Sequence, residues 1–152
     1  MNKTIDQKSK AVTISFVVDE TPQQVFDAIT NVRGWWGEGI EGGTREQGDQ
    51  FTYRHKDMHY SRHRLSEVMP GKRVVWLTTE SELNFVDDKD EWTGTLIVFQ
   101  IGQKNGKTTV EFTHDLSASL ECFSDCSNAW GFYVGDSLRS LITTGKGKPD
   151  PK

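Results

Sequence analysis

Apolar and polar residues alternate along several separate stretches of the chain, and this alternation predicts β-strands. In residues 11–18, the apolar residues Val12, Ile14 and Phe16 occupy every second position, which is the spacing of a strand with one buried face. Further strands are predicted over 51–56, 58–68, 73–79 and 93–101, and in the segment that ends at His114. The turn signals between them are Lys56-Asp57-Met58, Pro70-Gly71 and Asn105-Gly106.

Two other stretches have the three-to-four-residue apolar spacing of helices. In the first, Thr21 is a capping residue, Pro22 suits the first helical position, and Gln24 completes a capping box. We expect Gly34 to end this helix. The second runs from Leu120 to Leu141 with one apolar stripe. A helix of that length needs a broad surface to pack on, and the predicted sheet is the available one.

The order strand, helix, several hairpin strands and long helix therefore predicts an α+β fold. In this fold a curved antiparallel sheet of about six to seven strands wraps around the C-terminal helix. We expect one domain over residues 10–145, with flexible tails over 1–9 and 146–152, where hydrophobicity is low.

Five tryptophans in 152 residues indicate an apolar hollow inside this fold. Trp35 and Trp36 stand between Gly34 and Gly37, and we expect at least one of the two rings at the pocket mouth or in solvent, because adjacent side chains diverge. Aromatic and histidine side chains suit such a pocket, since each joins an apolar body to a polar group. The predicted ligand-binding residues are Trp35, Trp36, Tyr53, Trp76, Phe85, Trp92, His114 and Trp130. The alternative is that most of these rings fill the core.

Charge and composition narrow the class of partner. The net charge of -4 argues against nucleic acid as a partner. We expect no membrane insertion, because no apolar run reaches the ~18 residues of a transmembrane helix. The segment Met1–Lys10 lacks the apolar run of a secretory signal, so we predict a cytoplasmic protein.

At this point a set of short motifs resembles a known family. Their order and spacing are similar to those of the START-like or SRPBCC superfamily, in the branch of the C-terminal domain of the activator of Hsp90 ATPase. The motifs are Val18-Asp19-Glu20-Thr21-Pro22, Gly34-Trp35-Trp36, Gly48-Asp49-Gln50-Phe51, Glu67–Trp76, Glu91-Trp92-Thr93-Gly94-Thr95 and Phe112-Thr113-His114. The resemblance implies a helix-grip (START-like, Bet v 1-like) fold and a hydrophobic ligand cavity.

Candidate chemistry is sparse. His114 is the candidate acid or base, and the alternative is a hydrogen-bonded core histidine. His55, His59 and His63 have a regular spacing, but four residues along a strand span roughly 13 Å, too far for one ion. Only His55 and His59 could meet, across the turn, and a hairpin tip is usually solvated. We therefore predict no metal site.

The remaining features give no cofactor either. Cys122 and Cys126 are most simply small packing residues, although metal, redox and nucleophilic roles are conceivable. No GxxxxGK[ST], GxGxxG, GxSxG or HExxH motif occurs, so we predict no cofactor. A basic stripe, which could contact an acidic protein or simply face solvent, comprises Arg54, Lys56, Arg62 and Arg64. Leu96 and Val98 also alternate outward, which indicates either a homodimer contact or only scattered exposure.

The sequence thus predicts a binding module for a small hydrophobic or amphipathic molecule. A chaperone-associated or stress-response interaction protein of the Hsp90-activator type is the alternative. A second alternative is a cyclase- or hydratase-like enzyme, in which His114, with Tyr53, would move a proton in a dry pocket. The fold alone does not choose among them.

Overall fold

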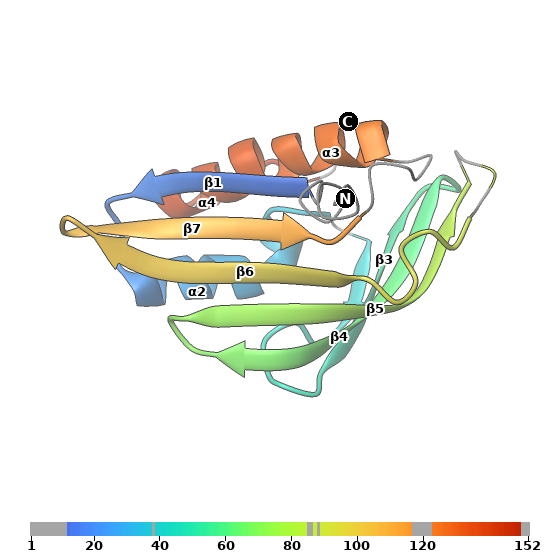
Figure 1. Cartoon of the computed structure of the whole chain (residues 1–152), viewed down its shortest axis with the longest axis horizontal. Coiled ribbons are helices and arrows are strands. Elements are labelled where there is room, and N and C mark those ends of the chain that lie inside the picture. Colours follow the sequence, from blue (N-terminus) through green and yellow to red (C-terminus); the bar gives the residue numbers. More distant parts are fainter. Residues whose placement is uncertain (1–11, 38, 85–86, 88, 117–122, 150–152) are drawn as a thin grey trace, which may run out of the picture.

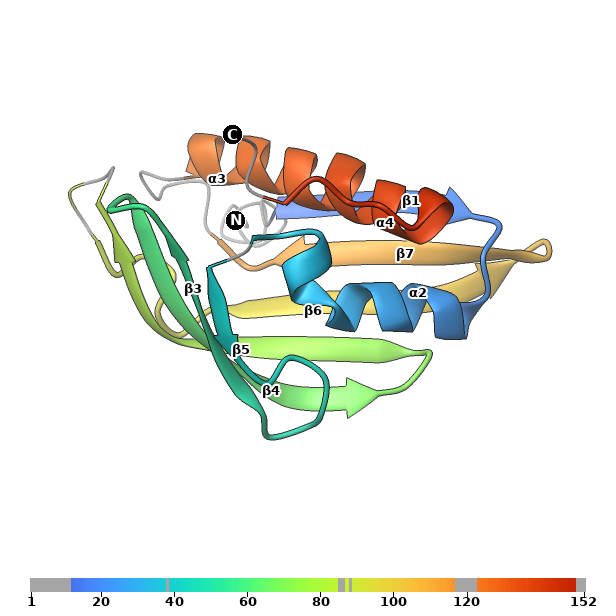
Figure 2. The same cartoon turned by 180° about the vertical axis from the view of Figure 1, so that it is seen from behind.

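The computed structural model describes residues 12–37, 39–84, 87, 89–116 and 123–149 of the chain. Figure 1 shows a curved sheet with the helices on one side of it, and Figure 2 shows the same arrangement from behind. The strands are β1 (Val12–Val18), β2 (Ile40–Gly42), β3 (Gln50–His55), β4 (His59–Met69), β5 (Arg73–Leu83), β6 (Leu96–Lys104) and β7 (Lys107–His114). The helical segments are α2 (Pro22–Thr30), η1 (Val32–Gly34), α3 (Phe123–Phe132), η2 (Tyr133–Leu138) and α4 (Arg139–Thr144).

The seven strands form one antiparallel sheet in the order β1-β7-β6-β5-β4-β3-β2. The predicted α+β helix-grip architecture is therefore confirmed. The three predicted turns are also confirmed, and at Asn105-Gly106 both residues have positive φ, 54° and 80°, as a two-residue hairpin turn requires. The short strand β2 was not expected as a separate element. Conversely, the predicted strand over 93–101 begins only at Leu96, because residues 92–94 form turns.

Helix α2 begins as its sequence predicts. The backbone N–H of Gln24 donates to Thr21 Oγ1 over 3.1 Å, and the backbone N–H of Thr21 donates to Gln24 Oε1 over 2.9 Å. This reciprocal pair is a capping box. The α-helix ends earlier than expected, at Thr30, and the chain reaches Gly34 through the short 3₁₀ turn η1. That turn directs the following two tryptophans toward the sheet.

The C-terminal helix is continuous from Phe123 to Thr144 but changes its pitch in the middle. The segment η2 is a π-helix between the α-helices α3 and α4. The buried residues Trp130, Val134, Leu138 and Ile142 follow one another at intervals of four. In a regular α-helix of 3.6 residues per turn such a stripe would rotate steadily away from the sheet. The wider π turn compensates for this drift and keeps the stripe facing the core. The expected start at Leu120 lies outside the described residues.

The bend of the sheet is built into β4 and β5. The pairing register of these two strands shifts between Arg62 and His63 and again between Leu65 and Glu67. Each shift places one extra residue on one strand, which is a β-bulge that increases local twist. The strands consequently curve around the helices (Figures 1 and 2), and the end of the β3–β4 hairpin approaches α3.

Candidate functional site

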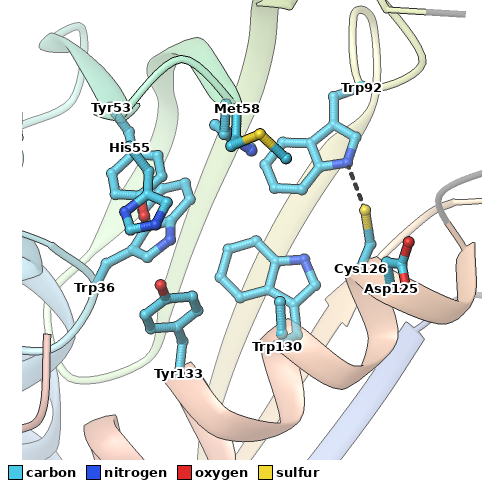
Figure 3. A pocket seen from close by; sticks show the side chains of 11 residues that line it. Trp36, Tyr53, His55, Met58, Trp92, Asp125, Cys126, Trp130 and Tyr133 are labelled. Atoms are coloured by element: carbon cyan, nitrogen blue, oxygen red, sulfur yellow. Dashed lines mark hydrogen bonds between the residues drawn. The ribbon is translucent and has the colours of Figure 1, made fainter. Parts of the chain in front are cut away.

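A cavity of about 150 Å³ lies between the β3–β4 hairpin, the turn that carries Trp92, and helix α3. Figure 3 shows aromatic rings from all three elements pointing into the same space. The lining residues are Trp36, Tyr53, His55, Met58, His59, Trp92, Asp125, Cys126, Ala129, Trp130 and Tyr133. Its rim is exposed at Met58, Asp125 and Ala129, whereas Trp36, Trp92 and Trp130 are buried. The cavity therefore has an aromatic floor and an opening between the hairpin and α3.

The floor is a connected set of stacked rings centred on Trp36. The ring of Trp36 lies 4.1 Å from that of Tyr53, centroid to centroid, at an interplanar angle of 13°. Trp130 lies 5.1 Å from Trp36 and stacks with Trp92 at 5.6 Å and 17°. Offset and edge contacts of this kind stabilise beyond simple apolar burial. The floor is thus preformed.

The prediction that Trp35 or Trp36 reaches the mouth or solvent is wrong. Both side chains are buried, with 0% and 2% of their surface exposed, and their rings stack at 6.3 Å. The expectation assumed regular backbone, in which neighbours diverge. Here Trp35 ends η1 with φ -132° and ψ -27°, and this irregular conformation turns both side chains inward. Trp36 enters the pocket floor, while Trp35 packs behind it and donates from Nε1 to the carbonyl of Ile29 over 3.1 Å.

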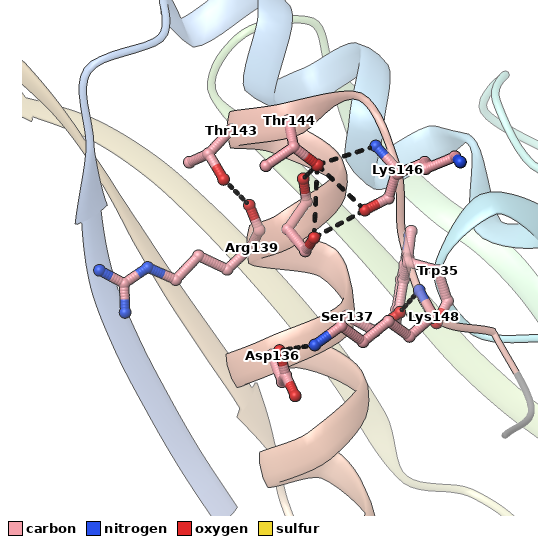
Figure 4. Close-up of polar contacts among 9 residues, drawn as sticks. Trp35, Asp136, Ser137, Arg139, Thr143, Thr144, Lys146 and Lys148 are labelled. Carbon is pink, nitrogen blue, oxygen red and sulfur yellow. Dashed lines mark hydrogen bonds and ion pairs between the residues drawn. The ribbon is translucent and has the colours of Figure 1, made fainter.

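Residues near the C-terminus hold the segment that carries Trp35 (Figure 4). Ser137, at the π-helix, donates from Oγ to the carbonyl of Trp35 over 2.7 Å and accepts the backbone N–H of Lys148 over 2.7 Å. A Cβ atom at Gly147 would stand 2.1 Å from the carbonyl oxygen of Gly34. Gly147 of the predicted tail therefore packs directly against Gly34 and Trp35, and Lys148 is linked to this segment through Ser137. The mobility of that tail stays a prediction, and residues 1–9 and 150–152 lie outside the described residues.

A chain of hydrogen bonds runs from the pocket wall into the core along β4. His59 Nε2 is 2.9 Å from Ser61 Oγ, and Ser61 Oγ is 2.8 Å from His63 Nε2. His63 Nδ1 is in turn 3.0 Å from Thr78 Oγ1 on β5. His59 is half-buried, and the other three side chains are buried. The spacing of these histidines predicted no shared metal, and it gave no sign of the hydroxyl groups that link them.

Burial keeps these imidazoles uncharged. It lowers the pKa of His59 from 6.5 to about 3, and the nearby His55 adds to this effect. Burial likewise lowers the pKa of His63 well below its usual value, with further lowering by His59 and His114. The imidazoles of His59 and His63 in this hydrogen-bonded chain are therefore neutral near pH 7. Each has one donor and one acceptor nitrogen.

His114, the candidate acid or base, has both ring nitrogens occupied. Nδ1 accepts from Trp130 Nε1 over 3.0 Å, and Nε2 is 2.8 Å from Thr95 Oγ1. Because Thr95 Oγ1 also donates to the carbonyl of Trp92, it accepts from His114, whose proton therefore sits on Nε2. Burial lowers the pKa of His114 to about 3. These contacts fit the alternative of a hydrogen-bonded core histidine, one that holds Trp130 in position from behind the cavity.

Four of the eight predicted ligand-binding residues line the cavity: Trp36, Tyr53, Trp92 and Trp130. Trp35, Trp76 and His114 lie behind this lining, and Phe85 is outside the described residues. Sequence reasoning missed His59 and Tyr133. A signal for Tyr133 existed, since it follows Trp130 by three residues on the same helix. His59 was discounted as part of a solvated hairpin tip.

Among the described residues, the other candidate groups form no second centre. Cys126 lines the cavity and accepts from Trp92 Nε1 over 3.3 Å, whereas Cys122 is outside the described residues. In the part of the chain that the structure describes, no three His, Cys, Asp or Glu residues are placed to hold a metal ion. No described helix is both long and apolar enough to cross a membrane.

The predicted basic stripe is mixed in charge. The guanidinium group of Arg54 lies over the ring of Tyr60 at 4.7 Å, and Arg62 lies 3.9 Å from the carboxylate of Glu80. Tyr60 also donates to Glu80 over 3.3 Å. These side chains are largely exposed, so the pairs contribute little stability. Glu80 therefore interrupts the basic surface beside Arg62.

Comparison with known proteins identifies the fold. No family model matches the chain, and no curated protein sequence does. Among solved structures it is similar to the Aha1 dimer from Colwellia psychrerythraea, with a TM-score of 0.73 and 21% identity over 90% of this chain and 98% of that one. It is also similar to SSP2350 from Staphylococcus saprophyticus, with a TM-score of 0.66 and 17% identity over 90% and 94%.

A third likeness is to DynU16, a protein in the dynemicin biosynthetic locus. The TM-score is 0.67 and the identity is 15%, and the match covers 92% of this chain. It covers 49% of the DynU16 chain, so this chain spans about half of that protein's length. The fold is thus the α+β helix-grip fold that the motifs implied. The likeness to the Aha1 structure bears out the resemblance to the Hsp90-activator branch at the level of the fold.

Proposed function

We propose that this protein binds a small, mainly apolar molecule in the cavity between β3–β4, Trp92 and α3. The observation that carries the proposal is the preformed aromatic floor of Trp36, Trp92 and Trp130 beneath an opening at the rim. Concave sites with apolar walls and few polar groups are typical ligand sites. The sequence predicted such a ligand, and the arrangement of these residues supports it.

The size of the cavity limits what can be enclosed. A dry apolar cavity of about 150 Å³ is large enough to take up benzene, and this cavity has about the same volume. Sites for drug-sized ligands are larger, roughly 300–1,000 Å³. The floor therefore accepts one ring or a short branched chain. A larger or amphipathic ligand would place one such group inside and the rest past Met58 and Asp125 at the rim.

Ligand-detected NMR and calorimetry with single-ring probes, such as toluene, indole and cyclohexane, test this proposal. Ala129 lines the opening and is exposed, so Ala129→Leu should obstruct the cavity and weaken binding. Asn128→Leu places the same side chain at the neighbouring exposed position, which does not line the cavity, and should bind like the wild type. Equal binding by the two variants, or no binding of any probe to the wild type, would contradict the proposal.

The two other functions stay predictions. An interaction role would use the stripe of Arg54, Arg62 and Arg64, in which Arg62 lies beside the carboxylate of Glu80. A homodimer would use Leu96, whose side chain is 39% exposed. Reversing Arg62 and Arg64 to Glu in a pull-down tests the first, and equal recovery of partners would count against it. A cyclase- or hydratase-like reaction at His114 would require that ring to give up its bond to Trp130 or Thr95.

A further inference from the structure

We infer that His59 presents an N–H donor to the cavity, so that the ligand is a small ring compound carrying a neutral hydrogen-bond acceptor, such as a carbonyl oxygen. This inference rests on the proposed ligand-binding function and specifies its chemistry. It follows from the direction of the hydrogen bonds between His59 and Thr78, which can be worked out from the core outward.

The innermost group sets that direction. Thr78 Oγ1 is buried, and His63 Nδ1 is its hydrogen-bond partner among the described residues. A buried hydroxyl proton needs an acceptor, since an unpaired one keeps the full cost of its desolvation. Thr78 therefore donates to His63 Nδ1. A neutral imidazole with an accepting Nδ1 carries its proton on Nε2, so His63 donates from Nε2 to Ser61 Oγ.

Ser61 passes this direction on to the pocket wall. Its hydroxyl is buried and contacts two groups within the described part of the chain, His63 Nε2 and His59 Nε2. Because it accepts from His63, its own proton must go to His59 Nε2. The remaining proton of neutral His59 then sits on Nδ1, for which no protein acceptor occurs among the described residues. If each hydrogen bond between His59 and Thr78 ran the other way, the hydroxyl proton of Thr78 would have no acceptor in the core.

The surroundings of His59 favour an uncharged ligand group. Its ring lies among aromatic rings, 4.6 Å from Trp92 and 5.0 Å from Tyr53, centroid to centroid. A carboxylate entering this floor would lose its hydration without meeting a cation, because the ring is neutral. The carboxylate of Asp125 at the rim would also repel it. A neutral carbonyl or ether oxygen has a smaller desolvation cost and gains the hydrogen bond.

A second donor is available on the same floor. Nε1 of Trp36 has no acceptor among the described residues, and Figure 3 shows this nitrogen on the side of the ring that faces the cavity. An indole N–H can only donate. His59 and Trp36 thus offer two N–H donors to an acceptor on the ligand.

The first test needs no variant and no ligand. Long-range ¹H–¹⁵N spectra of the histidine rings in the full-length protein report which nitrogen carries the proton. The expected result is Nδ1–H for His59 and Nε2–H for both His63 and His114. An Nε2–H tautomer of His59 would overturn the inference.

The second test compares acetophenone with α-methylstyrene, in which a methylene group replaces the carbonyl oxygen at nearly the same shape. His59→Phe should reduce the preference for acetophenone over α-methylstyrene about fivefold, the effect of one ordinary hydrogen bond. Tyr60→Phe, next to His59 on β4 but outside the cavity lining, should leave the preference unchanged. Binding of both probes with a preference that His59→Phe does not alter would overturn the inference and leave the proposed function standing. No binding of either probe, or of apolar rings, would overturn both.

Discussion

Acid should destabilise this protein steeply, because its buried histidines cannot take up protons while it is folded. The pKa of His59 and that of His114 are lowered from 6.5 to about 3 in the folded state, chiefly by burial. Between these two values the unfolded chain binds more protons than the folded one. The free energy of unfolding therefore falls as the pH falls from about 6.5 toward 3.

The size of the effect follows from the two pKa values. For one histidine with a pKa of 6.5 unfolded and about 3 folded, the free energy of unfolding drops by about 2 kcal/mol between pH 7 and pH 5. His59 and His114 together give about 4 kcal/mol, and His63 acts in the same direction. Whole domains are commonly stable by only about 5–15 kcal/mol, so this loss is a large part of the total.

Urea denaturation at pH 7 and pH 5 measures this difference directly. His114→Gln removes one titrating ring while its amide can still accept from Trp130 and donate to Thr95, so it should lose about 2 kcal/mol less than the wild type between these pH values. Asn128→Gln, at an exposed position of α3, changes no titrating group and is the control, which should lose as much as the wild type. If wild type and His114→Gln lose the same amount, the histidine does not titrate as the burial argument requires.

Three further predictions concern stability at neutral pH. Trp130→Phe removes the donor to His114 Nδ1 and part of the pocket floor. It should lower the free energy of unfolding by about 2 kcal/mol in urea denaturation. An unchanged free energy of unfolding would refute the stabilising role of this hydrogen bond and ring. Gly147→Ala places a Cβ atom 2.1 Å from the carbonyl oxygen of Gly34, and should cost about 1–3 kcal/mol. Gly131→Ala, where a Cβ meets nothing within 4 Å in α3, should instead stabilise by about 1 kcal/mol. A Gly147→Ala variant as stable as the wild type in thermal or urea unfolding would count against the contact at Gly147.

Most of the fold was predictable because its signals are local. The alternation in residues 11–18, the capping box at Thr21 and the turn at Asn105-Gly106 each specify an element through neighbours in the sequence. The short strand β2 was not predictable, since three residues, Ile40–Gly42, are too few to show a period. The π-helix has only a faint signal, the four-residue steps of the buried stripe, which an α-helical spacing also tolerates.

The site was predictable in composition but not in arrangement. Aromatic residues pointed to a pocket, yet which rings line it depends on contacts between distant segments. His59 stands beside a hairpin turn and would be solvated there, but Trp92 and α3 cover it from far along the chain. The same coverage turns His59, Ser61 and His63 into a buried hydrogen-bonded chain. No local pattern in the sequence reports that coverage.

The stacking of the tryptophans also has an optical consequence. Trp36 lies within 6.3 Å, centroid to centroid, of each of the other four indoles in the chain. At such separations the excited states of indoles couple, and excitation energy moves between rings faster than it is emitted. The five indoles therefore behave as one chromophore. A quencher that touches Trp36 from the cavity will darken the emission of the whole set, and near-ultraviolet circular dichroism will report their common geometry rather than the sum of five separate rings.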